Sequence, residues 1–90
     1  MPEVEITAAG AHAYEATVTA GEATTRHEIR VGEDFLARLG LAESQEPLLV
    51  RASVRYLLER QHPARIPASF GLGEIERTFP DYPRDIGTRL

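Results

Sequence analysis

The pattern of apolar and polar residues between Glu46 and His62 predicts the longest helix of the chain. On a helical wheel of about 100° per residue, charged side chains gather on one arc and apolar or small side chains on the opposite one. Ser44 stands where an N-cap is expected, Pro47 suits the first turn, and Pro63 marks the end. We expect this helix to carry the core through its apolar arc, which comprises Leu49, Val50, Ser53, Val54, Tyr56, Leu57 and Leu58.

Three stretches before residue 32 alternate polar and apolar residues with a period of two, which is typical of β-strands with one covered face. They span residues 3–8, 13–19 and 25–31, and Gly21 and Glu22 are expected to form a turn. The pattern predicts an antiparallel β-meander of two or three strands, covered on one face by the C-terminal half of the chain. The side chains expected to face the core are Val4, Ile6, Ala8, Tyr14, Ala16, Val18, His27, Ile29 and Val31.

Two shorter helices are expected on either side of the long one. The first runs over residues 33–39 and stops at Gly40, which suits the left-handed conformation that ends many helices. Residues 64–71 read as a loop, and residues 72–79 have helical spacing up to Pro80. Beyond Tyr82 the chain offers few anchors, so residues 83–90 are expected to form a flexible tail. The whole predicts a single α+β domain over residues 1–90.

This layout resembles that of a family of small, uncharacterised prokaryotic proteins. The resemblance covers residues 13–82 and rests on the helix Leu-Val-Arg-Ala-Ser-Val-Arg-Tyr-Leu-Leu-Glu-Arg of residues 49–60, on Ile66-Pro67-Ala68-Ser69-Phe70-Gly71-Leu72 with Ile75, and on the close Thr78-Phe79-Pro80-Asp81-Tyr82. It implies an α+β fold. The family has no established activity, so the resemblance implies no catalytic residue.

Composition and charge narrow the class of protein. The chain contains no cysteine, which excludes disulfides and thiolate chemistry, and no run of about 18 apolar residues that could span a membrane. Its net charge is −4, and the first 25 residues contain four glutamates and no basic residue. This balance argues against a nucleic-acid or membrane-surface partner. We expect a cytoplasmic protein.

No constellation of residues predicts catalysis or metal binding. His12, His27 and His62 share no local ligand spacing, and we expect no metal and no cofactor. Neither Ser53 nor Ser69 lies in the Gly-x-Ser-x-Gly turn that presents a catalytic serine. A chain this short leaves little room for both a core and a substrate pocket. We therefore do not expect an enzyme, although a minimal enzyme stays an alternative.

The sharpest positive signal is a series of four arginines in and after the long helix, Arg51, Arg55, Arg60 and Arg65. One hypothesis is a helix edge that grips phosphates, as in small DNA-binding regulators of the antitoxin type. The other is a solvated helix face, on which Arg55 pairs with Glu59 one turn later. The acidic first 25 residues favour the second. We thus expect a non-catalytic protein-interaction or regulatory module, and the wide apolar arc also allows self-association as a dimer.

Overall fold

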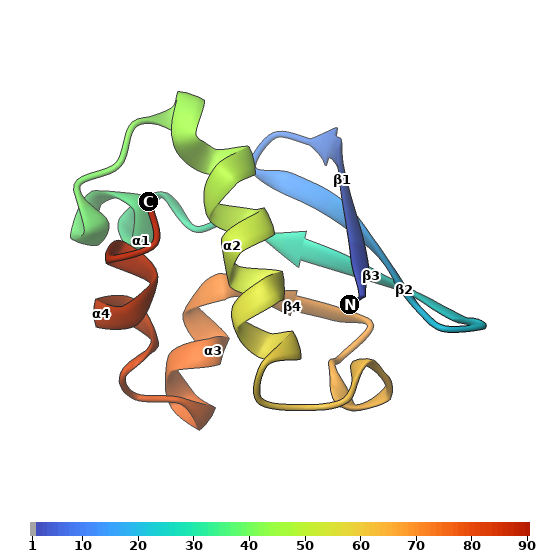
Figure 1. Ribbon diagram of the computed structural model, residues 1–90. Helices are drawn as coiled ribbons and strands as arrows, with labels where there is room; N and C mark the ends of the chain where they lie inside the picture. The colour runs from blue at the N-terminus through green and yellow to red at the C-terminus, as the bar shows by residue number, and fades with distance from the viewer. Residues whose placement is uncertain (1) are drawn as a thin grey trace.

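The computed structural model describes residues 2–90 and shows helices packed on one face of a small sheet (Figure 1). The strands are β1 (Glu3–Gly10), β2 (Ala13–Ala20), β3 (Ala23–Arg30) and β4 (Ser69–Gly71). The helices are α1 (Glu33–Leu39), α2 (Glu46–Leu58), α3 (Leu72–Thr78) and α4 (Tyr82–Gly87), with 3-10 turns η1 (Glu43–Gln45) and η2 (Pro63–Arg65). This is an α+β fold, as the residue patterns predict.

The sheet has four strands in the order β1-β2-β3-β4, not the two or three that were expected. The first three are antiparallel neighbours, which confirms the meander, whereas β4 runs parallel to β3. Strand β4 is only three residues long, which is too short for an alternating pattern, and it lies in the stretch predicted to be a loop. Its position is set by pairing with residues far away in the sequence, such as Ile29 opposite Phe70.

The side chains predicted to face the core do so on β2 and β3, and Val4 is buried on β1. Ala8 is the exception, because it is exposed. Ala8 still pairs with Tyr14 in the regular register, and the irregularity in the pairing of β1 with β2 lies after it, between Ala8 and Gly10. At the other hairpin, Gly21 has φ 65, as a two-residue turn with glycine at its first central position requires.

Helix α2 lies across β1 and β2 and provides the centre of the core (Figure 1). Leu49, Val50 and Leu57 are buried, as the helical wheel predicts. The helix ends at Leu58, four residues earlier than expected. Its start also differs, because Ser44 lies inside the 3-10 turn η1 and is not the N-cap.

The two short helices that were predicted are present, and a further one follows them. Helix α1 ends at Gly40 with φ 68, as expected. The prediction of few anchors beyond Tyr82 is wrong, because residues 82–87 form α4 and the Ile86 side chain is fully buried. Two apolar residues four positions apart, Tyr82 and Ile86, lie on one side of a short helix and reach the core.

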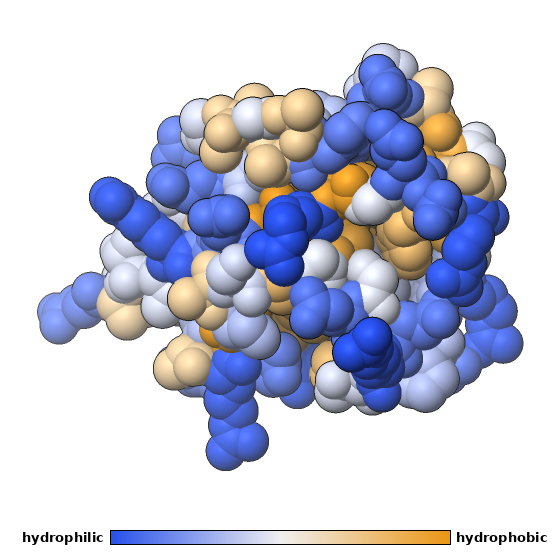
Figure 2. All heavy atoms as spheres, turned by 180° about the vertical axis from the view of Figure 1, so that it is seen from behind, coloured by the Kyte–Doolittle hydropathy of each residue, from blue (hydrophilic) through white to orange (hydrophobic). Residues whose placement is uncertain are grey.

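The face of the sheet opposite the helices carries mainly polar side chains. Glu15, Arg26, Glu28 and Arg30 are exposed there. Figure 2 views the molecule from the side opposite to Figure 1 and shows a mostly hydrophilic surface with hydrophobic residues visible between the polar ones. Among the helices within residues 2–90, none combines the length and the apolar character that a membrane span needs.

Candidate interaction surface

The outer side of α2 carries a shallow groove with an apolar lining and several guanidinium groups at its margin. Its volume is about 630 Å³. We call it the α2 groove, and its residues are Pro2, Leu48, Arg51, Ala52, Arg55, Leu58, Glu59, Arg89 and Leu90. Leu48 and Leu90 are the exposed large apolar side chains within residues 2–90, at 61% and 43%, and both line this groove. An exposed leucine beside guanidinium groups suits a partner that offers both apolar and acidic groups.

Arg51 and Arg55 are exposed and lie between two grooves. They also line a second groove of about 530 Å³, the β1 groove, together with Pro2, Glu3, Val4, Glu5, Thr17 and Thr19. Within residues 2–90 neither guanidinium forms an ion pair or a hydrogen bond with another residue. Their charges are therefore available to a partner.

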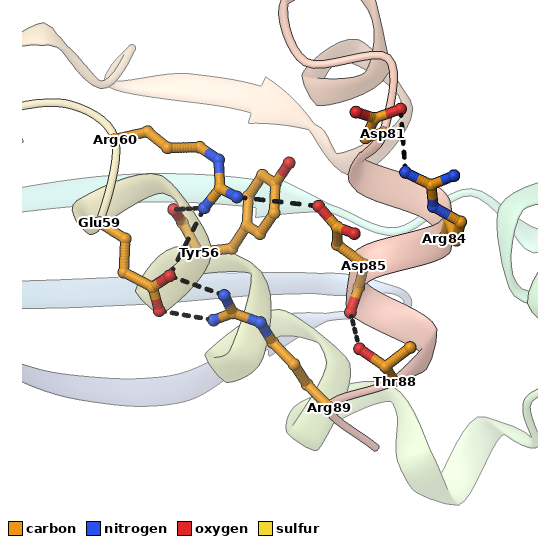
Figure 3. A network of polar contacts seen from close by, with 8 residues as sticks. All are labelled: Tyr56, Glu59, Arg60, Asp81, Arg84, Asp85, Thr88 and Arg89. Atoms are coloured by element: carbon orange, nitrogen blue, oxygen red, sulfur yellow. Dashed lines mark hydrogen bonds and ion pairs between the residues drawn. The ribbon is translucent and has the colours of Figure 1, made fainter.

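Arg60 is placed differently, because it packs over the ring of Tyr56 at 3.6 Å from the ring centroid (Figure 3). Its Nη1 donates to the Tyr56 carbonyl oxygen at 3.2 Å and lies 3.5 Å from Glu59. Its Nη2 lies 3.7 Å from the Asp85 carboxylate. These contacts hold Arg60 against the C-terminal helix, so it serves the fold.

The C-terminal segment is tied to α2 by a second arginine. Both terminal nitrogens of Arg89 donate to the Glu59 carboxylate at 2.7 Å, in the two-point geometry that arginine forms with carboxylates (Figure 3). This contact and Arg60 lower the pKa of Glu59 below its ordinary value. The expected pair between Arg55 and Glu59 is replaced by this one, which leaves Arg55 free of Glu59.

The fourth arginine of the series, Arg65, lies in η2 and lines a third groove with residues of α3. The structure therefore divides the series. It brings Arg51 and Arg55 together on one surface and places Arg60 and Arg65 elsewhere. A continuous edge of four guanidinium groups along the helix is not formed, because α2 ends at Leu58 and the chain turns away before Arg60.

A polar cluster joins the β1–β2 connection to the first turn of α2. The Glu46 side chain is buried, and its two carboxylate oxygens accept hydrogen bonds from different residues. Tyr14 Oη donates to Oε1 at 2.9 Å, and His12 Nδ1 donates to Oε2 at 2.7 Å. His12 has φ 55, a left-handed conformation that is uncommon outside glycine, and its Nε2 lies 3.4 Å from Glu33 Oε1.

The buried carboxylate shifts the titration of its neighbours. The hydrogen bond that His12 donates to Glu46 and the charge of Glu46 raise the pKa of His12 above 6.5, because they favour the charged imidazolium. Burial, followed by the hydrogen bond to Glu46, raises the pKa of Tyr14 to about 12. Tyr14 therefore remains a hydrogen-bond donor at neutral pH. The cluster connects a hairpin to a helix through satisfied hydrogen bonds, which is a structural role.

The other two histidines have structural partners. His27 Nδ1 donates to the Pro67 carbonyl oxygen at 2.8 Å, and its Nε2 lies 2.9 Å from Thr25 Oγ1. His62 Nδ1 accepts from the Ala64 N–H at 3.1 Å, at the start of η2. In the part of the chain that the structure describes, no three His, Asp or Glu side chains gather in a group that could hold a metal ion.

Of the residues that line the α2 groove, sequence reasoning proposed only Arg51 and Arg55 as contacts, and it did not single out Leu48, Arg89 or Leu90. For Leu48 a signal existed, because this leucine stands among charged residues on the helical wheel, far from the apolar arc. An apolar residue in that position either binds a partner or remains exposed. For Arg89 and Leu90 the sequence contains no such signal, because their positions depend on the packing of α4 against α2.

Comparison with protein-family models, with curated proteins and with solved structures finds no match for this chain. The family resemblance seen in the sequence pattern therefore transfers no site residue and no activity. Function has to be inferred from the surface itself.

Proposed function

We propose that this protein is a non-catalytic interaction module that binds an acidic, partly apolar segment of a protein partner on the outer side of α2. The observation that carries the proposal is the α2 groove, where Leu48 is 61% exposed beside Arg51 and Arg55. Within residues 2–90 these two guanidinium groups have no acidic partner.

The chemistry of the groove sets what it can bind. Covering an exposed leucine side chain contributes roughly 1.5–3 kcal/mol to association. A guanidinium group binds a carboxylate through two parallel hydrogen bonds, which adds orientation to affinity. A segment with apolar side chains on one side and carboxylates at its edge would use both features.

A nucleic-acid-binding regulator is the alternative for the same arginines. Two phosphate contacts would supply only a shallow salt dependence, with a slope of about −0.9 per contact, whereas strong binders make about 6–10 contacts. The exposed Leu48 beside these arginines offers an apolar contact that a phosphate backbone does not use. These two observations favour a protein partner.

A minimal enzyme has less support from the geometry. The best-developed polar cluster, around Glu46, consists of groups that hydrogen-bond to one another. Its tyrosine hydroxyl and its carboxylate are already used inside the fold, so neither is positioned to act on a substrate.

The proposal is tested by fluorescence anisotropy with a labelled synthetic peptide that has leucines on one helical face and glutamates on the other. A second peptide, with lysines in place of the glutamates, controls for charge. We expect the acidic peptide to bind and the lysine peptide not to bind. Leu48→Ala should weaken binding by about tenfold, which corresponds to about 1.4 kcal/mol of lost burial.

The double variant Arg51→Ala with Arg55→Ala should abolish binding of the acidic peptide. The matched control is Arg77→Ala, which removes an exposed arginine from α3, away from the α2 groove. This control should bind as the wild type does. Equal binding of both peptides, or full binding by the double variant, would contradict the proposal.

Fluorescence anisotropy also distinguishes a nucleic-acid-binding regulator from the interaction module. Random duplex DNA is titrated with the wild type at about 50 and 200 mM salt, which is the range over which phosphate contacts are lost. We expect no binding. Binding that weakens steeply with salt and disappears in the double variant would favour the regulator over the interaction module.

A further inference from the structure

Strand β1 lies at one edge of the sheet (Figure 1). Arg51 and Arg55 line the β1 groove together with residues of this strand. The strand is eight residues long and pairs with β2 on its inner side. We propose that the partner of this surface is a second copy of the chain, joined by antiparallel pairing of β1 with β1 about a two-fold axis at Ile6. The inference rests on the proposed function, because the same arginines take part, and it names the partner.

The backbone groups available for such pairing follow from the β2–β3 hairpin. In a two-residue turn the flanking residues, here Ala20 and Ala23, form a hydrogen-bonded pair, and hydrogen-bonded and non-bonded pairs then alternate along the strands. Counting along β2, residues Glu15, Thr17 and Thr19 direct their backbone groups toward β1. Their partners on β1 are Thr7, Glu5 and Glu3. The alternate residues Val4, Ile6 and Ala8 therefore direct N–H and C=O outward, toward a second copy.

Acidic side chains on β1 select the register. A two-fold axis at Glu5 would place Glu5 opposite its own copy, and an axis at Val4 would place Glu3 opposite Glu5 of the second copy, both of which are repulsive. An axis at Thr7 would require the irregular end of β1, near Gly10, to pair with the second copy. An axis at Ile6 avoids all three faults, since Glu5 then lies opposite Thr7 of the second copy.

This register also makes the charges of the two helices complementary. Helix α2 runs antiparallel to β1, because Glu46 contacts the β1–β2 connection whereas Arg51 and Arg55 lie beside the start of β1. A two-fold axis at Ile6 therefore sets the two α2 helices antiparallel. Arg51 and Arg55 of one copy then face the start of the other copy's helix, where Glu43 is exposed.

The same two-fold rotation also brings an apolar residue into the interface between the two copies. Leu48 stands between Glu43 and Arg51 on the chain and remains 61% exposed in a single copy. Residues 43–48 of the second copy thus supply the acidic, partly apolar segment that the α2 surface requires. The surface is self-complementary, as a two-fold interface must be.

Cysteine cross-linking tests the register, because the chain contains no cysteine of its own. Opposed residues of a hydrogen-bonded antiparallel pair have Cα atoms about 5.5 Å apart, which a disulfide can bridge. We expect Ile6→Cys to form a disulfide-linked dimer under mild oxidation. Thr7→Cys should not cross-link to itself, because its diagonal separation of about 7–8 Å is too long.

A second cysteine experiment uses only exposed positions, so it does not depend on replacing the partly buried Ile6. A mixture of Glu5→Cys and Thr7→Cys chains should form cross-linked heterodimers, since these two residues lie opposite each other. Glu22→Cys, in the distant β2–β3 turn, is the matched control and should not cross-link with either. Self-linking of Thr7→Cys, or no preference for the Glu5–Thr7 pair, would overturn the register.

Sedimentation equilibrium measures the assembly without cross-linking. We expect the wild type to form dimers with increasing concentration, Thr7→Glu to be monomeric, and Thr7→Glu combined with Glu5→Arg to dimerise again. A wild-type mass of one chain at every concentration would overturn the inference. If such a monomer still binds the acidic peptide, the proposed function stands without this partner. If it binds neither the acidic peptide nor a second copy of the chain, both proposals fail.

Discussion

The hydrogen bond from Tyr14 to Glu46 offers the most direct test of the structure. Tyr14→Phe removes one hydroxyl and leaves the ring in place. Glu46 is only 3% exposed, so water has little access to the oxygen that loses its donor. The other oxygen keeps its hydrogen bond from His12. The substitution therefore isolates a single donor at a buried charged group.

The expected loss can be estimated from that geometry. A hydrogen bond to a charged group contributes roughly 1.5–3 kcal/mol to stability. The bond is 2.9 Å long, and it joins residues 32 positions apart, so its loss weakens the attachment of α2 to the hairpin. We expect Tyr14→Phe to lower the free energy of unfolding by about 2 kcal/mol, or the Tm by about 8–16 °C in a domain of this size.

Urea denaturation followed by circular dichroism measures this loss. The midpoint should fall while the dependence on denaturant stays unchanged, because the surface exposed on unfolding is the same. Tyr56→Phe is the matched control, since within residues 2–90 the hydroxyl of this buried tyrosine has no hydrogen-bond partner. Equal losses in the two variants would refute the assigned role of the Tyr14 hydroxyl.

Three further predictions concern the core and the polar cluster. Leu57→Ala and Ile86→Ala should each lower the free energy of unfolding by about 2–5 kcal/mol in urea denaturation, and a loss below about 1 kcal/mol would show that the corresponding helix is not docked as described. Glu46 raises the pKa of His12 above 6.5, so the stabilisation from the charged imidazole is complete below pH 6.5 and is lost as the pH rises through the folded-state pKa. Unfolding measured between about pH 5 and 8 should show this loss in the wild type and not in His12→Asn, which tolerates the left-handed backbone; identical pH profiles would contradict it.

Local patterns were sufficient where a feature depends on neighbouring residues. The alternation on β2 and β3 identifies the covered face, because successive side chains of a strand point to opposite sides. Gly40 ends α1 because glycine adopts the left-handed conformation without a Cβ clash. The buried arc of α2 follows from 3.6 residues per turn, through which Leu49, Val50 and Leu57 share one side.

The sequence also contains the residues of the candidate interaction surface, but it does not show where they lie. It contains the arginines and Leu48, but the series of four arginines did not reveal which of them a partner could reach. The tertiary structure separates them, because α4 docks on α2 and brings Asp85 to Arg60, which also packs over Tyr56 of α2. Arg51 and Arg55 lie outside that contact.

Only the tertiary structure decided the contacts between residues that are distant in the chain. Strand β4 exists because Phe70 pairs beside Ile29, and the buried carboxylate of Glu46 is stable because His12 and Tyr14 reach it from the hairpin. No local period encodes such contacts. Each forms only after the loop between its two residues has closed, and the energy that holds it comes from the whole packed core.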